Sequence, residues 1–448
     1  MNNLLEIWRR LETGEKVSEN KFDIILSKKA TQLKKDYKIH YDSSMVIPLD
    51  KSIWSDIFEA AVELLSTVGI FCYDTSTRIK LKEEEILDKI RKVPNKVIIG
   101  EGREKREYKS RSPDDNDPPL IGGGPVGCPV SEEIYAKVLS SYAKENIDAL
   151  STGLLISKSV EIKKDTPTEL AAVTLEVSLA REALDKVNKP GLGIIGPSSG
   201  ITATALNSSL SSKGMRNTDI HTTVIQTELK VDLHTLNRIY YLLFNEAILE
   251  VGQCPLIRYL GGPEETAIIS VSEILLDFIL GGTCAAFSPT SMSSSLSTER
   301  EALWVTAVTI LATKKHFKPL IGNWIWAGAG PCTEMICYEI AAQTILGSVV
   351  GADMIISAGS TAGKQIDHYT GMEAKIARDT VDFSKRVNLR KANEIINELL
   401  KFYENYISSR KIPLGKSFKE CYSLESLTPS AQYTKIWESI KDKISEIL

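Results

Sequence analysis

The spacing of hydrophobic positions divides the chain near residue 115. Residues 54–68 (WSDIFEAAVELLSTV) and 81–90 repeat apolar side chains at helical intervals, with polar connectors between such segments. A polar, proline-containing stretch, residues 109–119, follows and indicates a linker. The pattern therefore predicts an N-terminal helical extension over residues 1–115.

After this linker, short apolar runs alternate with longer helical patterns. Each interval between runs leaves room for a loop and one helix. One of these helices has an explicit start, because Thr166 can act as its N-cap, Pro167 fits the first turn and Glu169 completes a capping box. The eight runs cover residues 120–123, 148–153, 191–196, 219–224, 255–260, 283–288, 319–326 and 353–359.

Eight successive strand–helix units predict a (β/α)8 barrel, the TIM barrel, over residues 116–384. A doubly wound open sheet is the alternative, but such a sheet rarely keeps eight regular units. From residue 385 onward the hydrophobic spacing is helical again. We therefore expect an α/β protein in which a C-terminal helical cap over residues 385–448 follows the barrel.

The third run, GLGIIG at residues 191–196, matches the dinucleotide-binding pattern G-x-G-x-x-G. In a Rossmann fold this pattern follows a strand and opens a helix. Here it follows a predicted helix and precedes a long polar loop, so we interpret it as a barrel strand rather than a phosphate-binding loop. Ile194 and Ile195 then face opposite sides of that strand, and one of them lies near the mouth of the barrel.

Composition excludes several classes of partner. The net charge is −4 without an extended basic run, which argues against nucleic-acid binding. The seven cysteines are scattered without a CxxC pair, which argues against a disulfide framework and a structural metal site. No apolar run is long enough to cross a membrane, and the N-terminus has no apolar signal core. We expect a soluble, cytoplasmic chain.

Six segments along the chain carry a more specific signal. In order, they are GPVGCPVSEEIY (124–135), GLGIIGPSSG (191–200), TELKVDL (227–233), GGPEET (261–266), GNWIWAGAGPCTEM (322–335) and TGMEAK (370–375). Together they resemble the monomethylamine:corrinoid methyltransferases of methanogens. The resemblance implies a (β/α)8 barrel that assembles as a homo-oligomer, expected to be a hexamer. It also implies transfer of a methyl group from monomethylamine to the cobalt of a separate corrinoid protein.

The resemblance fails at the centre of the implied site. Members of that family carry pyrrolysine at the barrel mouth, directly before a Gly-Pro step, and its imine ring is thought to bind the amine. In this chain Ile195 precedes Gly196 and Pro197. The sequence therefore presents a hydrocarbon side chain at the position where the resemblance implies a reactive imine.

The polar groups that the resemblance implies around the amine are also replaced. The two acid positions fall on Thr222 and Gly252, and Glu250 could substitute for the second of them in space. The glutamine and tyrosine positions fall on Trp324 and Trp326. If this alignment holds, nothing that would activate a neutral methylamine is left at these positions.

One interpretation is that the methyl donor already carries a fixed positive charge. A quaternary ammonium or a sulfonium releases a neutral leaving group, so it needs neither an electrophile nor a proton donor. Such a cation is held by aromatic faces, and Trp324 and Trp326 are two residues apart, on the same side of one strand. The alternative is that both rings only fill the barrel mouth.

A carboxylate on the donor is a further possibility. Arg258 and Tyr259 end the predicted fifth strand, and one of the two should face inward. An inward Arg258 would bind a carboxylate with two hydrogen bonds and favour a betaine-like zwitterion. An outward Arg258 would instead pair with a helix carboxylate.

The remaining candidate residues concern catalysis and the docking of a partner protein. His221 could hydrogen-bond the substrate or act as an acid, or it could be structural, and Glu250 is the second catalytic candidate. Gly328 and Gly330 would allow another backbone or ring to approach closely. Glu334 could line the face that docks a corrinoid protein, or serve the N-terminus of the next helix.

The sequence thus predicts a corrinoid-dependent methyltransferase without pyrrolysine, acting on a small methylated cation or zwitterion. We expect no metal or cofactor bound to this chain, because a partner protein would supply the cobalamin. A catalytically inactive family member that binds or scaffolds a corrinoid protein is the alternative. An ordinary barrel lyase or hydrolase would have only Glu250, Arg258 and Lys364 as candidates.

Overall fold

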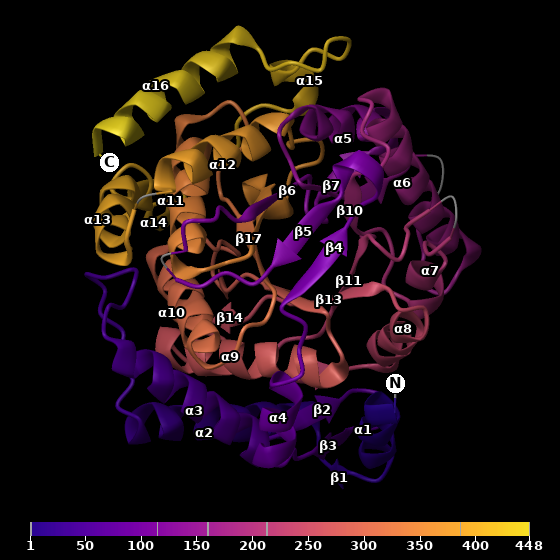
Figure 1. Ribbon diagram of the computed structural model, residues 1–448, viewed down its shortest axis with the longest axis vertical. Coiled ribbons are helices and arrows are strands. Elements are labelled where there is room, and N and C mark those ends of the chain that lie inside the picture. The colour runs from indigo at the N-terminus through magenta and orange to yellow at the C-terminus, as the bar shows by residue number, and fades with distance from the viewer. Residues whose placement is uncertain (1, 114, 159–160, 212–213, 386, 448) are drawn as a thin grey trace.

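Eight parallel strands close into a barrel, and helices surround it (Figure 1). A computed structural model describes residues 2–113, 115–158, 161–211, 214–385 and 387–447. Each strand pairs with the next one along the barrel, which confirms the predicted (β/α)8 fold. The strands are β6 (Leu120–Gly123), β8 (Ala149–Ser151), β10 (Gly193–Gly196), β11 (Ile220–Val224), β13 (Ile248–Gln253), β15 (Cys284–Phe287), β17 (Ile321–Trp326) and β18 (Met354–Gly359).

One helix follows each barrel strand and packs on the outside. Both α9 and α11 end at glycines in the left-handed conformation, Gly281 and Gly351, because only glycine adopts it without strain. The helices are α5 (Tyr135–Lys144), α6 (Pro167–Lys186), α7 (Ala203–Asn207), α8 (Leu233–Phe244), α9 (Pro263–Leu280), α10 (Arg300–His316), α11 (Glu334–Val350) and α12 (Gly371–Ser384).

The fifth strand does not lie where the sequence pattern predicts it. The prediction of residues 255–260 was wrong, because β13 (Ile248–Gln253) occupies that place between β11 and β15. The predicted segment contributes only β14 (Leu256–Ile257), which pairs with β16 (Thr290–Ser291) outside the barrel. Each segment carries one charged residue, Glu250 in β13 and Arg258 in the predicted run, so the hydrophobic pattern does not distinguish the two.

Side chains alternate between the inside and the outside of the barrel, as expected for strands. On β10, Ile195 belongs to the interior cluster, whereas Ile194 packs outward into the helical layer. The interior cluster includes Ala149, Ile195, Ile220, Ile248, Cys284, Ala286, Trp324, Met354 and Ile356.

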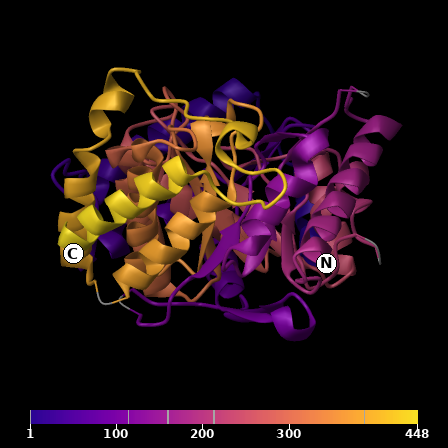
Figure 2. The same cartoon turned by 90° about the horizontal axis from the view of Figure 1, so that it is seen from above.

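A hairpin seals the N-terminal end of the barrel. It consists of β4 (Lys96–Ile99) and β5 (Arg106–Lys109), and it crosses in front of the barrel strands in Figure 1 and projects from one end in Figure 2. The Gly100 N–H donates to the Thr218 carbonyl oxygen at 2.9 Å, directly before β11 begins. Ile99 and Tyr108 are buried in the interior cluster. The barrel is therefore open only toward the C-terminal ends of its strands, where sites form in this fold.

The N-terminal part contains the predicted helices but also strands that the pattern did not predict. Its helices pack mainly against α9 and α10, along the lower edge of Figure 1. A small sheet joins β1 (Glu15–Lys16), β2 (Ile70–Cys72) and β3 (Thr77–Ile79) to β12 (Lys230–Val231), from the loop after β11. The helices are α1 (Asn2–Glu12), α2 (Glu19–Asp36), α3 (Lys51–Thr67) and α4 (Glu83–Ile90).

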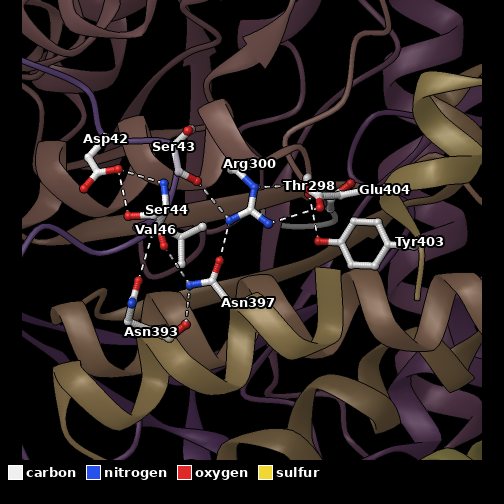
Figure 3. A network of polar contacts seen from close by, with 10 residues as sticks. All are labelled: Asp42, Ser43, Ser44, Val46, Thr298, Arg300, Asn393, Asn397, Tyr403 and Glu404. Atoms are coloured by element: carbon white, nitrogen blue, oxygen red, sulfur yellow. Dashed lines mark hydrogen bonds and ion pairs between the residues drawn. The ribbon is translucent and has the colours of Figure 1, made fainter. Parts of the chain in front are cut away.

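The C-terminal helices pack beside α11 and are tied to the start of α10 (Figure 3). The Arg300 guanidinium donates to both Glu404 carboxylate oxygens, at 2.8 and 3.0 Å, and also to Asn397. It also donates to the Ser43 carbonyl oxygen at 3.3 Å, so one side chain joins both ends of the chain to the barrel. The helices are α13 (Leu389–Leu400), α14 (Glu404–Ser408), α15 (Phe418–Cys421) and α16 (Ala431–Ile447). No helix in the described part of the chain is long and apolar enough to span a membrane.

Candidate active site

A cavity of about 760 Å³ lies at the C-terminal ends of β8, β10, β11 and β17. This is the end of the barrel opposite the β4–β5 hairpin, and the volume suits a small organic ligand. Within the described residues, no cluster of three histidine, cysteine, aspartate or glutamate side chains could hold a metal ion. The cavity wall includes Ser151, Ile195, Thr222, Arg238, Trp324 and Trp326.

Ile195 lies in the wall of this cavity, near the end of β10, as the sequence predicts for one of the two isoleucines. Its Cδ1 atom is 2.9 Å from the point where a Cβ on Gly122 would lie, so a larger residue at 122 would displace it. The side chain is 3% exposed and purely hydrocarbon. This part of the cavity therefore carries no nucleophile, acid or base from β10.

The loop after Ile195 is held from behind by two carboxylates of α6. Glu176 accepts hydrogen bonds from the backbone N–H groups of Ser198 and Ser199, at 2.8 and 2.6 Å. Glu169 accepts from the N–H groups of Ile201 and Thr202, at 2.8 and 3.0 Å. Thr166 caps α6 as predicted. Glu169 does not complete the predicted capping box, because its carboxylate accepts from this loop and from the Asp165 N–H rather than from the Thr166 N–H. The loop forms the rim of the cavity beside β10.

Trp324 reaches across the barrel interior onto β13. A Cβ on Gly252 would lie only 2.2 Å from the Cη2 atom of the indole, so the ring occupies the space that a side chain at 252 would need. Trp324 is 6% exposed and lines the cavity with one part of the ring. Trp324 can therefore take this position only because residue 252 has no side chain.

Trp326 lies against β18 and the turn after it. A Cβ on Gly359 would be 2.8 Å from the indole Cε3 atom, and one on Gly363 would be 3.2 Å from Cζ3. The pairing of β17 with β18 shifts register between Trp324 and Trp326. The two rings thus start from the same side of β17, as predicted, and pack toward different neighbours. The cavity has indole in two parts of its wall.

Thr222 separates Glu250 from the cavity. The Thr222 hydroxyl lines the cavity and donates a hydrogen bond of 2.8 Å to the Glu250 Oε1 atom. Glu250 is fully buried beneath it, and among the described residues its Oε2 atom has no hydrogen-bond partner. Burial raises the pKa of this carboxyl to about 7. Glu250 therefore lies below the cavity wall and is protonated in about half of the molecules at neutral pH.

A buried arginine that the sequence pattern did not single out also lines the cavity. Arg238 is 1% exposed and lies on α8, on the same face as Thr235, Ile239 and Leu242. A charged residue at a core-facing position of an amphipathic helix is the signal that could have revealed it. Burial lowers the pKa of its guanidinium to about 9, so it stays charged at neutral pH.

Comparison with known proteins now places the chain. A family model described as monomethylamine methyltransferase MtmB matches residues 3–448. The chain belongs to this family. It is 31% identical to monomethylamine methyltransferase MtmB2 of Methanosarcina barkeri strain Fusaro over 448 residues, covering 99% of this chain and 97% of the relative. It is 30% identical to MtmB of Methanosarcina mazei over the same length, with the same coverage.

Solved structures of the MtmB family have the same fold. The crystal structure of the Methanosarcina barkeri monomethylamine methyltransferase superposes with a TM-score of 0.96 at 29% identity. The match covers 99% of this chain and 98% of the other. A structure described as the hydroxylamine MtmB complex matches with the same TM-score, identity and coverage. Both the recognition of the family and the (β/α)8 architecture are thereby confirmed.

The structure places His221 outside the cavity of this MtmB family member. Its neighbour Thr222 faces inward, so His221 points into the helical layer, where it is fully buried. Its Nε2 atom lies 2.9 Å from the Arg216 carbonyl oxygen. Burial, with Arg238 nearby, lowers its pKa to about 4, so the ring is neutral. The geometry fits the structural alternative rather than contact with a substrate.

Arg258 and Tyr259 do not end a barrel strand and do not line the cavity. The expectation that one of them faces inward was wrong, because it depended on the misplaced fifth strand. The Arg258 guanidinium pairs with Glu301 in the first turn of α10 at 2.5 Å, and 63% of its side chain is exposed. The Tyr259 hydroxyl donates to Asp23 at 2.8 Å. The outward alternative for Arg258 is confirmed.

The expected docking residues are largely covered by the chain itself. Gly328 and Gly330 are buried, and a Cβ on Gly330 would lie 1.7 Å from the Leu414 carbonyl oxygen. The backbone that approaches closely is therefore the chain's own segment 412–415. Only Glu334 is exposed, in the first turn of α11, next to the N-cap Thr333. Gly328 and Gly330 are thus not free to contact a partner protein.

Proposed function

We propose that this protein is a methyltransferase without pyrrolysine that uses a donor with a fixed positive charge. The donor class is a small quaternary or zwitterionic methylated amine, or a sulfonium. The acceptor is the cobalt of a corrinoid on a separate protein, which is a co-substrate and not a cofactor of this chain. The observation that carries the proposal is the cavity wall, in which Ile195 and two tryptophans stand near one another at the barrel mouth.

The chemistry of such a donor fits what the cavity offers. When the acceptor attacks the methyl carbon, the carbon–nitrogen bond breaks and its electron pair stays on nitrogen. A quaternary ammonium then leaves as a neutral tertiary amine, so no proton has to be supplied. Ile195 offers no proton, and Glu250 is covered by Thr222. The chain's contribution is to bind and orient the cation and to exclude water.

The two indoles supply the binding surface for the cation. A quaternary ammonium has no N–H group, so its favourable protein contacts are aromatic faces and apolar side chains. Each indole contributes about 0.5–2 kcal/mol to a cation that has lost its water. Trp324 and Trp326 together can therefore offset much of the cost of removing the cation from solvent.

Trp326→Ala should weaken binding of a quaternary ammonium donor by about 10-fold, because one aromatic face is lost. Isothermal titration calorimetry with tetramethylammonium measures the change in dissociation constant. Trp8→Ala is the matched control, because Trp8 packs in the N-terminal region outside the cavity. An unchanged dissociation constant for Trp326→Ala would show that the ring only fills space and does not bind the cation.

The decisive assay mixes the protein with cob(I)alamin and a panel of N-methyl and S-methyl compounds. Methylcobalamin should form, detected by its absorbance spectrum, from quaternary or sulfonium donors but not from monomethylamine. If no compound yields methylcobalamin while the corrinoid is demonstrably reduced, the enzyme proposal fails. Binding of a corrinoid protein without any transfer would then favour the scaffold alternative. Turnover of monomethylamine would refute the requirement for a pre-charged donor.

We further propose that the chain assembles as a homo-oligomer, with a hexamer as the expected form. Phe244, the last residue of α8, is 64% exposed, and large exposed aromatic side chains are typical of contact surfaces. Size-exclusion chromatography with light scattering measures the mass directly. A monomer at micromolar concentration would contradict this proposal and leave the donor proposal untouched.

A further inference from the structure

Arg238 is one of two buried cations in the described chain without an ion pair. Unlike Arg111, whose guanidinium donates to four backbone carbonyl oxygens, it lines the cavity. Among the described residues, no carboxylate lies within 4.0 Å of its guanidinium. By contrast, the buried Lys230 pairs with Asp23 at 2.9 Å, and the buried Lys314 pairs with Asp353 at 2.6 Å.

The carboxylate of Glu176, which already accepts from the Ser198 and Ser199 N–H groups, attracts the charge of Arg238 from beyond 4.0 Å. A buried charge without a directly bonded acidic partner is costly.

The hydrogen bonds of Arg238 are also incomplete. Its Nε atom donates to the Thr223 hydroxyl at 2.8 Å, which is a normal length. Its Nη atoms reach only the Asn207 side chain and the Thr222 carbonyl oxygen, both at 3.3 Å. A guanidinium carries five N–H groups, so at least two of the Nη hydrogens are left for another acceptor.

The charge of the cavity wall points to the sign of that acceptor. Among the described residues, the charged side chains of the wall are Lys164, Asp232 and Arg238. Asp232 is already occupied, because it caps α8 by accepting from Thr235 and also accepts from the Gln226 amide at 2.7 Å. The wall is therefore net positive, which disfavours a bare cation and favours a ligand that also carries a negative group.

Arg238 and the indole of Trp324 lie at the same end of β11. The guanidinium contacts the backbone of Thr222 and the side chain of Thr223. The Trp324 ring rests on Gly252, which is the register partner of Val224, the next residue of β11. Thr223 points outward like His221, so the guanidinium lies on the outer face of β11 and the indole on its inner face. The cavity has both groups in its wall, so a ligand that spans the end of β11 can present a cation to the indole and an anion to the guanidinium.

We propose that Arg238 binds a carboxylate of the methyl donor, so that the donor is a small trimethylammonio carboxylate held at both ends. This rests on the proposed function and narrows its donor class from cations in general to zwitterions. It also transfers to Arg238 the role that the sequence suggested for Arg258. Arginine suits this role, because two of its N–H groups match the two oxygens of a carboxylate.

The test compares matched ligands on the wild-type protein by calorimetry. The carboxylates are trimethylammonioacetate, 3-trimethylammoniopropanoate and 4-trimethylammoniobutanoate, and each is paired with the alcohol in which CH2OH replaces the carboxylate. The best carboxylate should bind at least about 10-fold more tightly than its alcohol, the effect of hydrogen bonds to a charged group. Equal or tighter binding of the alcohols, or binding of none of the carboxylates, would refute the proposal.

Two substitutions then assign the effect to Arg238. Arg238→Gln should weaken binding of the best carboxylate by about 10–100-fold and leave its alcohol within about 3-fold. Arg238→Lys keeps the charge and should restore part of the affinity. A purely structural arginine would weaken both ligands equally, and that result would overturn the assignment. The wild-type comparison remains decisive if Arg238→Gln does not fold.

Two different outcomes separate a failure of the carboxylate site at Arg238 from a failure of methyl transfer. If the carboxylate binds through Arg238 but yields no methylcobalamin with cob(I)alamin, the carboxylate site stands and methyl transfer fails. If tetramethylammonium and the alcohols are demethylated as well as the carboxylates, methyl transfer stands and the assignment of Arg238 fails.

Discussion

Gly252→Val is expected to weaken binding of the cationic donor by about 100-fold. The new Cβ would lie 2.2 Å from the indole of Trp324, which has to move. The ring cannot retreat, because it is 6% exposed within the interior cluster. It is therefore pushed into the cavity, where it takes the place of the donor and loses its own binding face.

A double-mutant cycle tests this mechanism for Gly252→Val. If the substitution acts through the ring, its effect on the dissociation constant should largely disappear in a Trp324→Ala background, because the obstructing indole is gone. Tryptophan fluorescence should shift in Gly252→Val as Trp324 moves. Additive effects in the cycle, or an unchanged affinity of the single variant, would show that Trp324 does not line the donor site.

The coupling between Gly252 and Trp324 bears on how the site differs from that of the family. The resemblance placed an acid at 252, and the ring now fills the space that an acid there would need. One replacement on β17 thus excludes a carboxylate on β13 for steric reasons. Ile195 on β10 is a separate change, since its Cδ1 atom lies against Gly122 on β6.

The fold could be predicted from the sequence wherever buried strands are apolar. Seven of the eight barrel strands overlap the predicted runs, and β13 is the exception. Its apolar run carries Glu250 as the segment after it carries Arg258, and only the assembled barrel shows that Glu250 is buried. The β4–β5 hairpin and the sheet through β12 were missed for a related reason. Their strands are short or pair with segments distant in sequence, so the local spacing of hydrophobic residues hardly predicts them.

The sequence predicted those site residues whose position follows from the alternation of side chains along a barrel strand. Ile195, Thr222, Trp324 and Trp326 all line the cavity, and each lies on a strand whose position was predicted. Where the rings turn depends on Gly252 and Gly359, which are distant in sequence. Arg238 approaches from a helix after β11, and no motif marks it. Its charge at a core-facing helical position signals burial, but only the three-dimensional structure shows that it lines the cavity.

Glu250→Gln should stabilise the protein at alkaline pH by up to about 3 kcal/mol and hardly at all below pH 4.5. Burial raises the pKa of Glu250 to about 7 from an ordinary value of 4.5. Between these values the folded state holds a proton that the unfolded state releases, so stability falls as pH rises. Glutamine can still accept the hydrogen bond from Thr222 and carries no charge, so this loss disappears.

Urea unfolding at several pH values measures the difference between Glu250→Gln and wild type. The difference, rather than either curve alone, is informative, because burial also raises the pKa of Glu228 and Glu373 to about 7. Thr222→Val is a control that should change the pH dependence of stability in the opposite direction. In the wild type the Thr222 hydroxyl lowers the pKa of Glu250. Without it, the pH range in which stability falls should extend upward.

Parallel curves for Glu250→Gln and wild type would mean that Glu250 is ionised in the folded protein. An ionised carboxylate beside Thr222 would then be a counter-ion for the donor cation.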